Sequence, residues 1–182
     1  MSRDPDPTIK PALLEKILVY LLSHGLADLS LRPLAEAVGT TARMLIYHFR
    51  SKEQLIVEAL GLAQGKQIEA LRSSPTPKSS TEAELTYLWQ WFTSDEFLPF
   101  VKLLFEVEVQ AMSGNELYSN FANQILDGWV NFVKSRLANC DTITATLIVN
   151  TFSGLLLDQL ITNDVERVDA SFKAFASLVS KS

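Results

Sequence analysis

Residues 30–49 read SLRPLAEAVGTTARMLIYHF, and this stretch decides the fold of the N-terminal part of the chain. Two short helical patterns lie on either side of a turn that contains Gly39. The small Ala35 lets two helices cross closely, Gly39 can adopt the left-handed conformation of a tight turn, and Leu45 can anchor the second helix in the core. The spacing therefore predicts a helix-turn-helix.

Further helices are expected on both sides of this motif. Leucine and isoleucine recur at helical spacing over 10–24, and Gly25 follows as a C-terminal cap. Ser30 is a suitable cap for the first helix of the motif. After the motif, residues 51–54 (SKEQ) have the form of a capping box and predict a long helix that reaches about Arg72. Four helices are thus predicted in the first 72 residues.

The rest of the chain has the pattern of five more helices and shows no strand signal. Caps and turns place these helices over about 81–93, from 95 or 98 to 112, 116–138, 142–162 and from 165 onward. Ser and Pro dominate residues 73–80, which we expect to be a linker loop. The fold class is therefore all-α with about nine helices: a helix-turn-helix domain over 1–72, the linker over 73–80, and a larger helical domain over 81–182.

Positive charge is concentrated in the helix-turn-helix, although the whole chain has a formal net charge of −5. Residues 1–72 contain nine Lys and Arg against eight Asp and Glu, whereas the remainder contains seven against thirteen. Within residues 30–52, four cations are opposed only by Glu36. These cations are Arg32, Arg43, Arg50 and Lys52. A short basic segment in an otherwise acidic chain is typical of a nucleic-acid contact.

Composition and missing motifs exclude several classes of protein. Cys140 is the only cysteine, so no internal disulfide can form, and with two histidines it does not make an ordinary zinc site. We therefore expect a cytoplasmic protein without metal or cofactor. Residues 142–162 are apolar but contain five Thr and Asp158, which argues against a membrane span. No phosphate-binding glycine loop or nucleophile motif occurs, so we do not expect an enzyme.

The residues around the motif resemble the TetR family of bacterial transcriptional regulators. The resemblance covers the first helix, residues 31–39 (LRPLAEAVG) and above all residues 47–55 (YHFRSKEQL). The last segment is similar to that family's signature, aromatic-His-Phe-x-Ser-Lys-x-x-Leu. The sequence departs from the family at Ile46, where Tyr is common, and at Arg43, where Pro or a small residue is common. The resemblance implies a ligand-responsive repressor that binds a near-palindromic double-stranded DNA operator as a homodimer.

Most of the predicted DNA contacts lie near the N-terminal ends of three helices, and Tyr47 and His48 follow on the second of them as candidates for phosphate contacts. Arg43 can bond a guanine edge in the major groove, and Arg32 is a second candidate for a base contact. Lys52 is placed to neutralise a phosphate. For His48, a phosphate contact and a purely structural role both remain open. The predicted set is Arg32, Thr41, Ala42, Arg43, Met44, Tyr47, His48 and Lys52.

The last two helices are predicted to form a dimer interface. The helix over 142–162 is apolar on every side, so it needs cover on every side, and a domain of about 110 residues has little interior to supply it. The final helix carries apolar residues at alternating spacings of three and four. The alternative is a buried hairpin in a monomer, whereas the TetR resemblance implies a dimer. The predicted contacts are Ile148, Phe152, Leu155, Gln159, Val168, Phe172, Phe175 and Val179.

An aromatic-rich region precedes these helices and has two interpretations. Aromatic side chains on several helices can line an apolar ligand cavity, and they can equally fill the core. The resemblance implies a cavity for a small-molecule effector, here an apolar one. The predicted lining is Trp89, Phe92, Phe105, Gln110, Met112, Trp129 and Asn150. The alternative function is a helical small-molecule-binding or protein-interaction module whose DNA-binding unit has degenerated.

Overall fold

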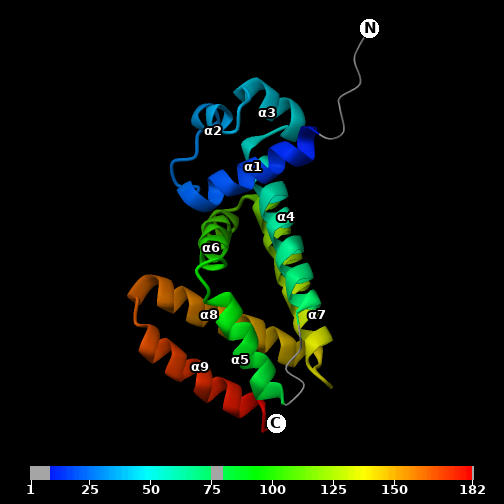
Figure 1. Ribbon diagram of the computed structural model, residues 1–182, viewed down its shortest axis with the longest axis vertical. Coiled ribbons are helices and arrows are strands. Elements are labelled where there is room, and N and C mark those ends of the chain that lie inside the picture. The colour runs from blue at the N-terminus through cyan, green and yellow to red at the C-terminus, as the bar shows by residue number, and fades with distance from the viewer. Residues whose placement is uncertain (1–8, 75–79, 182) are drawn as a thin grey trace. The chain divides into compact units, whose positions relative to one another are not determined.

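The computed structural model describes residues 9–74 and 80–181, and these residues form nine helices and no strand (Figure 1). The prediction of an all-α fold with about nine helices is confirmed. The helices are α1 (Ile9–His24), α2 (Leu31–Ala37), α3 (Ala42–Phe49), α4 (Lys52–Ser73), α5 (Thr81–Phe92), α6 (Leu98–Met112), α7 (Glu116–Arg136), α8 (Thr142–Thr162) and α9 (Val165–Val179). Residues 75–79 of the predicted linker lie outside the described residues.

The chain packs as two units that interleave along the sequence. Unit 1 comprises residues 1–67 and 102–122, and unit 2 comprises residues 68–101 and 123–182. The predicted domains follow the order of the chain, whereas packing groups most of α6 and the start of α7 with the N-terminal helices. The end of α4 packs with the C-terminal helices in the same way.

Local capping explains where the helices of unit 1 begin and end. Gly25 ends α1 with a φ of 73°, as predicted. Ser30 occupies the N-cap position of α2, but its side chain makes no capping hydrogen bond. Ser51 does cap α4, because its hydroxyl accepts from the backbone N–H of Gln54 at 3.0 Å. The side chain of Gln54 bonds Glu58 instead of closing the capping box.

Unit 1 buries one apolar core that reaches from α1 to α4. Seven of its side chains are fully buried: Ile17, Leu21, Leu34, Leu45, Phe49, Leu55 and Leu60. Val107 of α6 is fully buried as well. Burial of a large apolar side chain contributes about 1.5–3 kcal/mol. The two helices of the predicted motif are therefore anchored by their inward faces, which leaves their outward faces to solvent.

The helices of unit 2 also begin at capping side chains. Ser80 caps α5 by accepting from the N–H of Ala83 at 3.1 Å. Asp141 caps α8 and accepts from the N–H of Thr144 at 2.7 Å, and this hydrogen bond lowers the pKa of the Asp141 carboxyl. Asn163 adopts the left-handed conformation, with φ 55°, and ends α8.

The core of unit 2 is aromatic. Trp89 stacks on Phe172 with ring centroids 4.8 Å apart, and both rings meet Phe152 edge to face. The indole N–H of Trp89 donates to Asp169 at 2.8 Å, so its polar atom is satisfied as well. These contacts join α5, α8 and α9.

Helix α8 is the one helix within 9–74 and 80–181 that is long and apolar enough to cross a membrane. Five of its side chains pack inside unit 2: Ala145, Ile148, Val149, Phe152 and Leu156.

Candidate nucleic-acid interface

The turn between α2 and α3 has the geometry that its sequence predicts. Gly39 has a φ of 76°, a conformation in which a side chain is strained. The N–H of Thr40 donates to the carbonyl of Ala35 at 2.8 Å, which closes the turn. Ala35 is buried at the crossing, and the fully buried Leu45 anchors α3. Residues 31–49 therefore form a helix-turn-helix.

Helix α3 presents one face to the core and the other to solvent. Thr41 caps it, accepting from the N–H of Met44 at 3.2 Å. Because Leu45 and Phe49 are buried, the helical period turns the opposite side chains outward. Four exposed side chains make up this outward face: Arg43, Met44, Ile46 and Tyr47. Arg32 on α2 and Thr41 are exposed as well, whereas Ala42 is half-buried.

His48 lies at the edge of the core rather than on the outward face. Its ring meets Tyr47 and Phe49 edge to face, with centroids 5.2 and 6.4 Å away. The Nε2 atom is buried and has no hydrogen-bond partner. This placement favours the structural role over the phosphate contact that the sequence also left open.

Lys52 is only half-exposed at the start of α4. Its ammonium group donates to the carbonyl of Leu29 at 3.4 Å, in the loop before α2. This hydrogen bond holds the loop against α4, so the side chain has a structural role beside the predicted phosphate contact. The sequence contains no signal for it, because the two residues are 23 positions apart.

The chain reverses between α3 and α4 through a strained residue that sequence reasoning missed. Arg50 has φ 69° and ψ −46°, and the N–H of Ser51 donates across it to the carbonyl of Phe49 at 2.8 Å. This is a γ-turn with positive φ, which is rare in proteins because it strains residues that carry a Cβ.

We expect Arg50→Gly to raise the free energy of unfolding by about 0.5–1 kcal/mol, because glycine relieves this backbone strain. Arg50→Ala is the matched control, since it removes the charge but keeps the Cβ. Urea denaturation followed by helical circular dichroism measures both variants. An equal gain in Arg50→Ala would assign the effect to charge instead of backbone conformation.

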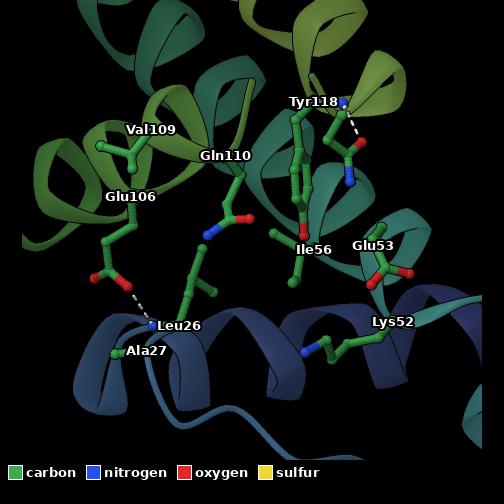
Figure 2. Close-up of a pocket in the computed structure, with 10 residues that line it drawn as sticks. Leu26, Ala27, Lys52, Glu53, Ile56, Glu106, Val109, Gln110 and Tyr118 are labelled. Carbon is green, nitrogen blue, oxygen red and sulfur yellow. Dashed lines mark hydrogen bonds between the residues drawn. The ribbon is translucent and has the colours of Figure 1, made fainter. Parts of the chain in front are cut away.

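A cavity of about 360 Å³ lies within unit 1 (Figure 2). It is bounded by the loop after α1, the start of α4, the end of α6 and the start of α7: Leu26, Ala27, Lys52, Glu53, Ile56, Glu106, Val109, Gln110, Asn115 and Tyr118. One Glu106 carboxylate oxygen accepts from the N–H of Leu26 at 2.8 Å. Burial, together with the carboxylate of Glu53, raises the pKa of Tyr118 to about 12, so its hydroxyl stays protonated at neutral pH.

Only one of the predicted ligand-binding residues, Gln110, lines this cavity. Trp89, Phe92 and Trp129 are buried in the aromatic core of unit 2, which agrees with the core interpretation of the sequence. Phe105 is half-buried on α6, and two residues are exposed to solvent, Met112 on α6 and Asn150 on α8. The seven residues are therefore divided between the two units and do not form one lining.

The predicted dimer contacts also need correction. Four of them fill the core of unit 2 and are not available to a second chain: Ile148, Phe152, Val168 and Phe172. The other four are half-buried: Leu155, Gln159, Phe175 and Val179. The reason is that α8 is apolar on both faces, and unit 2 packs the predicted face against its own α5 and α9.

A helix-turn-helix with a basic, outward-facing second helix is the architecture of DNA-binding transcriptional regulators. Residues 13–59 match the family model of bacterial regulatory proteins, tetR family. No curated protein matches the chain significantly.

Solved structures share the fold of the whole chain. The multidrug binding protein EbrR, complexed with proflavin, is 20% identical over 93% of this chain and 98% of its own, with a TM-score of 0.73. A TetR family member from Streptomyces coelicolor A3 is 19% identical over 94% and 97%, with a TM-score of 0.72. FadR from Bacillus subtilis, complexed with stearoyl-CoA, is 14% identical over 93% and 97%, with a TM-score of 0.68. Residues 13–59 thus match the N-terminal domain of the tetR family of bacterial regulatory proteins, and the chain as a whole has the fold of solved structures that include a TetR family member.

Proposed function

We propose that the protein is a ligand-responsive repressor that binds a near-palindromic operator as a homodimer. The outward face of α3 carries this proposal, because Arg43 and its exposed neighbours stand on a rigidly anchored helix in the most basic segment of the chain. Two such helices related by a two-fold axis would read half-sites about 34–36 Å apart. The alternative is a ligand-binding module whose DNA-binding unit has degenerated.

Selection of bound sequences from a random duplex pool distinguishes these functions. We expect a near-palindrome to be enriched, and its affinity to fall steeply with salt, with a logarithmic slope of about −0.9 per neutralised phosphate. A folded protein that enriches no sequence would support the degenerate module instead.

Arg43→Ala and Lys52→Ala should weaken operator binding in different ways. Arg43→Ala is expected to cost about 1–3 kcal/mol and to relax the preference at particular base pairs. Lys52→Ala should weaken binding to all sequences similarly and flatten the salt slope, because a phosphate contact carries no base information. Titration of the selected operator and of random duplex at two salt concentrations measures both effects. Equal losses on both DNAs for both variants would refute this division of roles.

The exposed face of α8 supports a dimer through a different set of residues from those first predicted. Six of its exposed residues follow alternating spacings of four and three: Ile143, Leu147, Asn150, Gly154, Leu157 and Ile161. This is the spacing of a helix–helix seam. A Cβ at Gly154 would meet no atom within 4 Å, so a second helix can approach closely there. Ile143 and Ile161 are 80% and 74% exposed, and cover by a partner would remove them from water.

Ile161→Glu should yield a folded monomer with weak operator binding, because a charge in an apolar seam opposes association. Gln90→Glu adds the same charge at an exposed position of α5 and serves as the matched control. Sedimentation measures the mass of each variant. A dimer of Ile161→Glu as tight as that of Gln90→Glu would exclude α8 as the interface.

A small-molecule effector completes the proposed function. The complexes of EbrR with proflavin and of FadR with stearoyl-CoA, two proteins of this fold, support it. The cavity of unit 1 is the candidate site, since Lys52 and Glu53 belong both to its wall and to the first turn of α4. An effector that binds one conformation of this turn more tightly would change the affinity for DNA. DNA would change the affinity for the effector by the same coupling free energy, typically about 1–3 kcal/mol.

Thermal-shift screening followed by operator titration tests the effector. We expect compounds that raise the melting temperature to weaken operator binding. If every stabilising compound left the operator affinity unchanged, regulation by a ligand would be refuted while DNA binding would stand.

A further inference from the structure

The outward face of α3 is unusually apolar for a surface that meets DNA. Met44 and Ile46 are each 39% exposed, and Tyr47 is 62% exposed. The described residues contain fourteen exposed large hydrophobic side chains, and three of them lie on this eight-residue helix. The core does not require them, because Leu45 and Phe49 already anchor the helix from its other face.

The positions of these side chains determine what they can contact. Arg43 lies opposite the buried Leu45, and the helical period places Ile46 on one side of Arg43 and Met44 on the other, with Tyr47 between Arg43 and Met44. An apolar side chain therefore stands on each side of the guanidinium group. If α3 enters the major groove as proposed, the guanidinium would face one base pair and these two side chains would face its neighbours.

Chemistry then limits the bases that fit. The major-groove edges of guanine, adenine and cytosine offer only hydrogen-bond donors and acceptors, whereas thymine also offers its C5 methyl group. The Ile46 side chain has no donor or acceptor, and the Met44 thioether is only a weak acceptor. Placing either against a polar edge would leave that edge without a hydrogen-bond partner. The thymine methyl is the one feature that gains from contact with them.

We propose that Ile46 and Met44 read thymine methyl groups, so that each operator half-site carries thymines on the base pairs next to the guanine that Arg43 contacts. This inference rests on the proposed operator binding and goes further, because it assigns part of the sequence preference to two residues without hydrogen-bonding side chains. Ile46 is then a determinant of specificity at a position where the residue common in the family is Tyr.

Replacing thymine with deoxyuridine tests the proposal, since it removes only the methyl group and keeps the base pair. The operator selected from a random pool is synthesised with one deoxyuridine at a time in each half-site, and affinities are measured for the full-length protein. We expect a two- to four-fold loss, about the value of one buried methyl, at the thymines that flank the Arg43 guanine. Other thymines should tolerate the change.

Variants identify the side chain that reads each methyl. Ile46→Ala should bind the thymine operator about three- to ten-fold more weakly and should lose its sensitivity to deoxyuridine at one position. Met44→Ala should lose its sensitivity to deoxyuridine at a different position of the half-site. Val19→Ala truncates a side chain of α1 that is 67% exposed, and it should retain the complete deoxyuridine pattern.

The outcomes separate this inference from the proposed function. Enrichment of an operator whose affinity is indifferent to every deoxyuridine substitution would overturn the methyl readout and leave the repressor intact. If the operator affinities of Ile46→Ala and Met44→Ala both kept the complete sensitivity to deoxyuridine, the methyl readout would be overturned as well. Failure to enrich any sequence would overturn both proposals.

Discussion

Replacing Arg136 with methionine is expected to lower the free energy of unfolding of unit 2 by about 3–5 kcal/mol. Arg136 and Glu84 form a buried ion pair, with Nε donating to the carboxylate at 2.6 Å and side chains only 7% and 3% exposed. The guanidinium also donates to the carbonyl of Leu71 near the end of α4 at 2.8 Å. The substitution keeps most of the volume but leaves a carboxylate and a carbonyl without their donor, and a buried unpaired charge is very costly.

Tryptophan fluorescence during urea denaturation measures this loss in unit 2 alone. Trp89, Trp91 and Trp129 are the only tryptophans in the sequence, and all three belong to unit 2. The double variant Glu84→Leu/Arg136→Met is the control, because it removes both charges and should recover most of the stability. A loss below about 1 kcal/mol in the single variant would contradict the assignment of a buried pair.

Phe172→Ala is expected to cost about 3–5 kcal/mol, the usual range for a large aromatic side chain removed from a core. The phenyl ring is 2% exposed, stacks on Trp89 and meets Phe152 edge to face, so its removal leaves a cavity lined by aromatic rings. The same fluorescence-detected denaturation measures the loss.

Val165→Ala on the same helix is the control for Phe172→Ala. Its side chain is 46% exposed, and we expect a loss below about 1 kcal/mol. A stable Phe172→Ala that no longer dimerises would restore this residue to the interface that its sequence spacing suggested. The structure predicts instead that Phe172→Ala destabilises unit 2.

Features determined by neighbouring residues could be predicted from the sequence. The turn at Gly39 and the caps at Ser51 and Asp141 depend on residues at most a few positions away, so their patterns are visible in the chain. The outward position of Arg43 follows from the helical period once Leu45 is recognised as buried. The helix bounds and the exposed face of α3 could be predicted for this reason.

Features determined by packing could not be predicted. Helix α8 has apolar residues on both faces, so the sequence does not distinguish the inward Ile148 from the outward Leu147. The Glu84–Arg136 pair joins residues 52 positions apart, so it leaves no local pattern in the sequence. Aromatic residues such as Trp89 give the same sequence signal whether they fill a core or line a cavity.

The reversal at Arg50 has a mechanical consequence. Only Arg50 and Ser51 separate α3 from α4, and both backbone N–H groups are engaged, one with the carbonyl of Ile46 and one with that of Phe49. A two-residue connection with both N–H groups hydrogen-bonded has little freedom to absorb a rotation, and the positive φ of Arg50 persists only because the surrounding structure imposes it. In the proposed repressor, a small rotation of the first turn of α4 would therefore be passed on to α3 and would change how this helix fits a DNA groove.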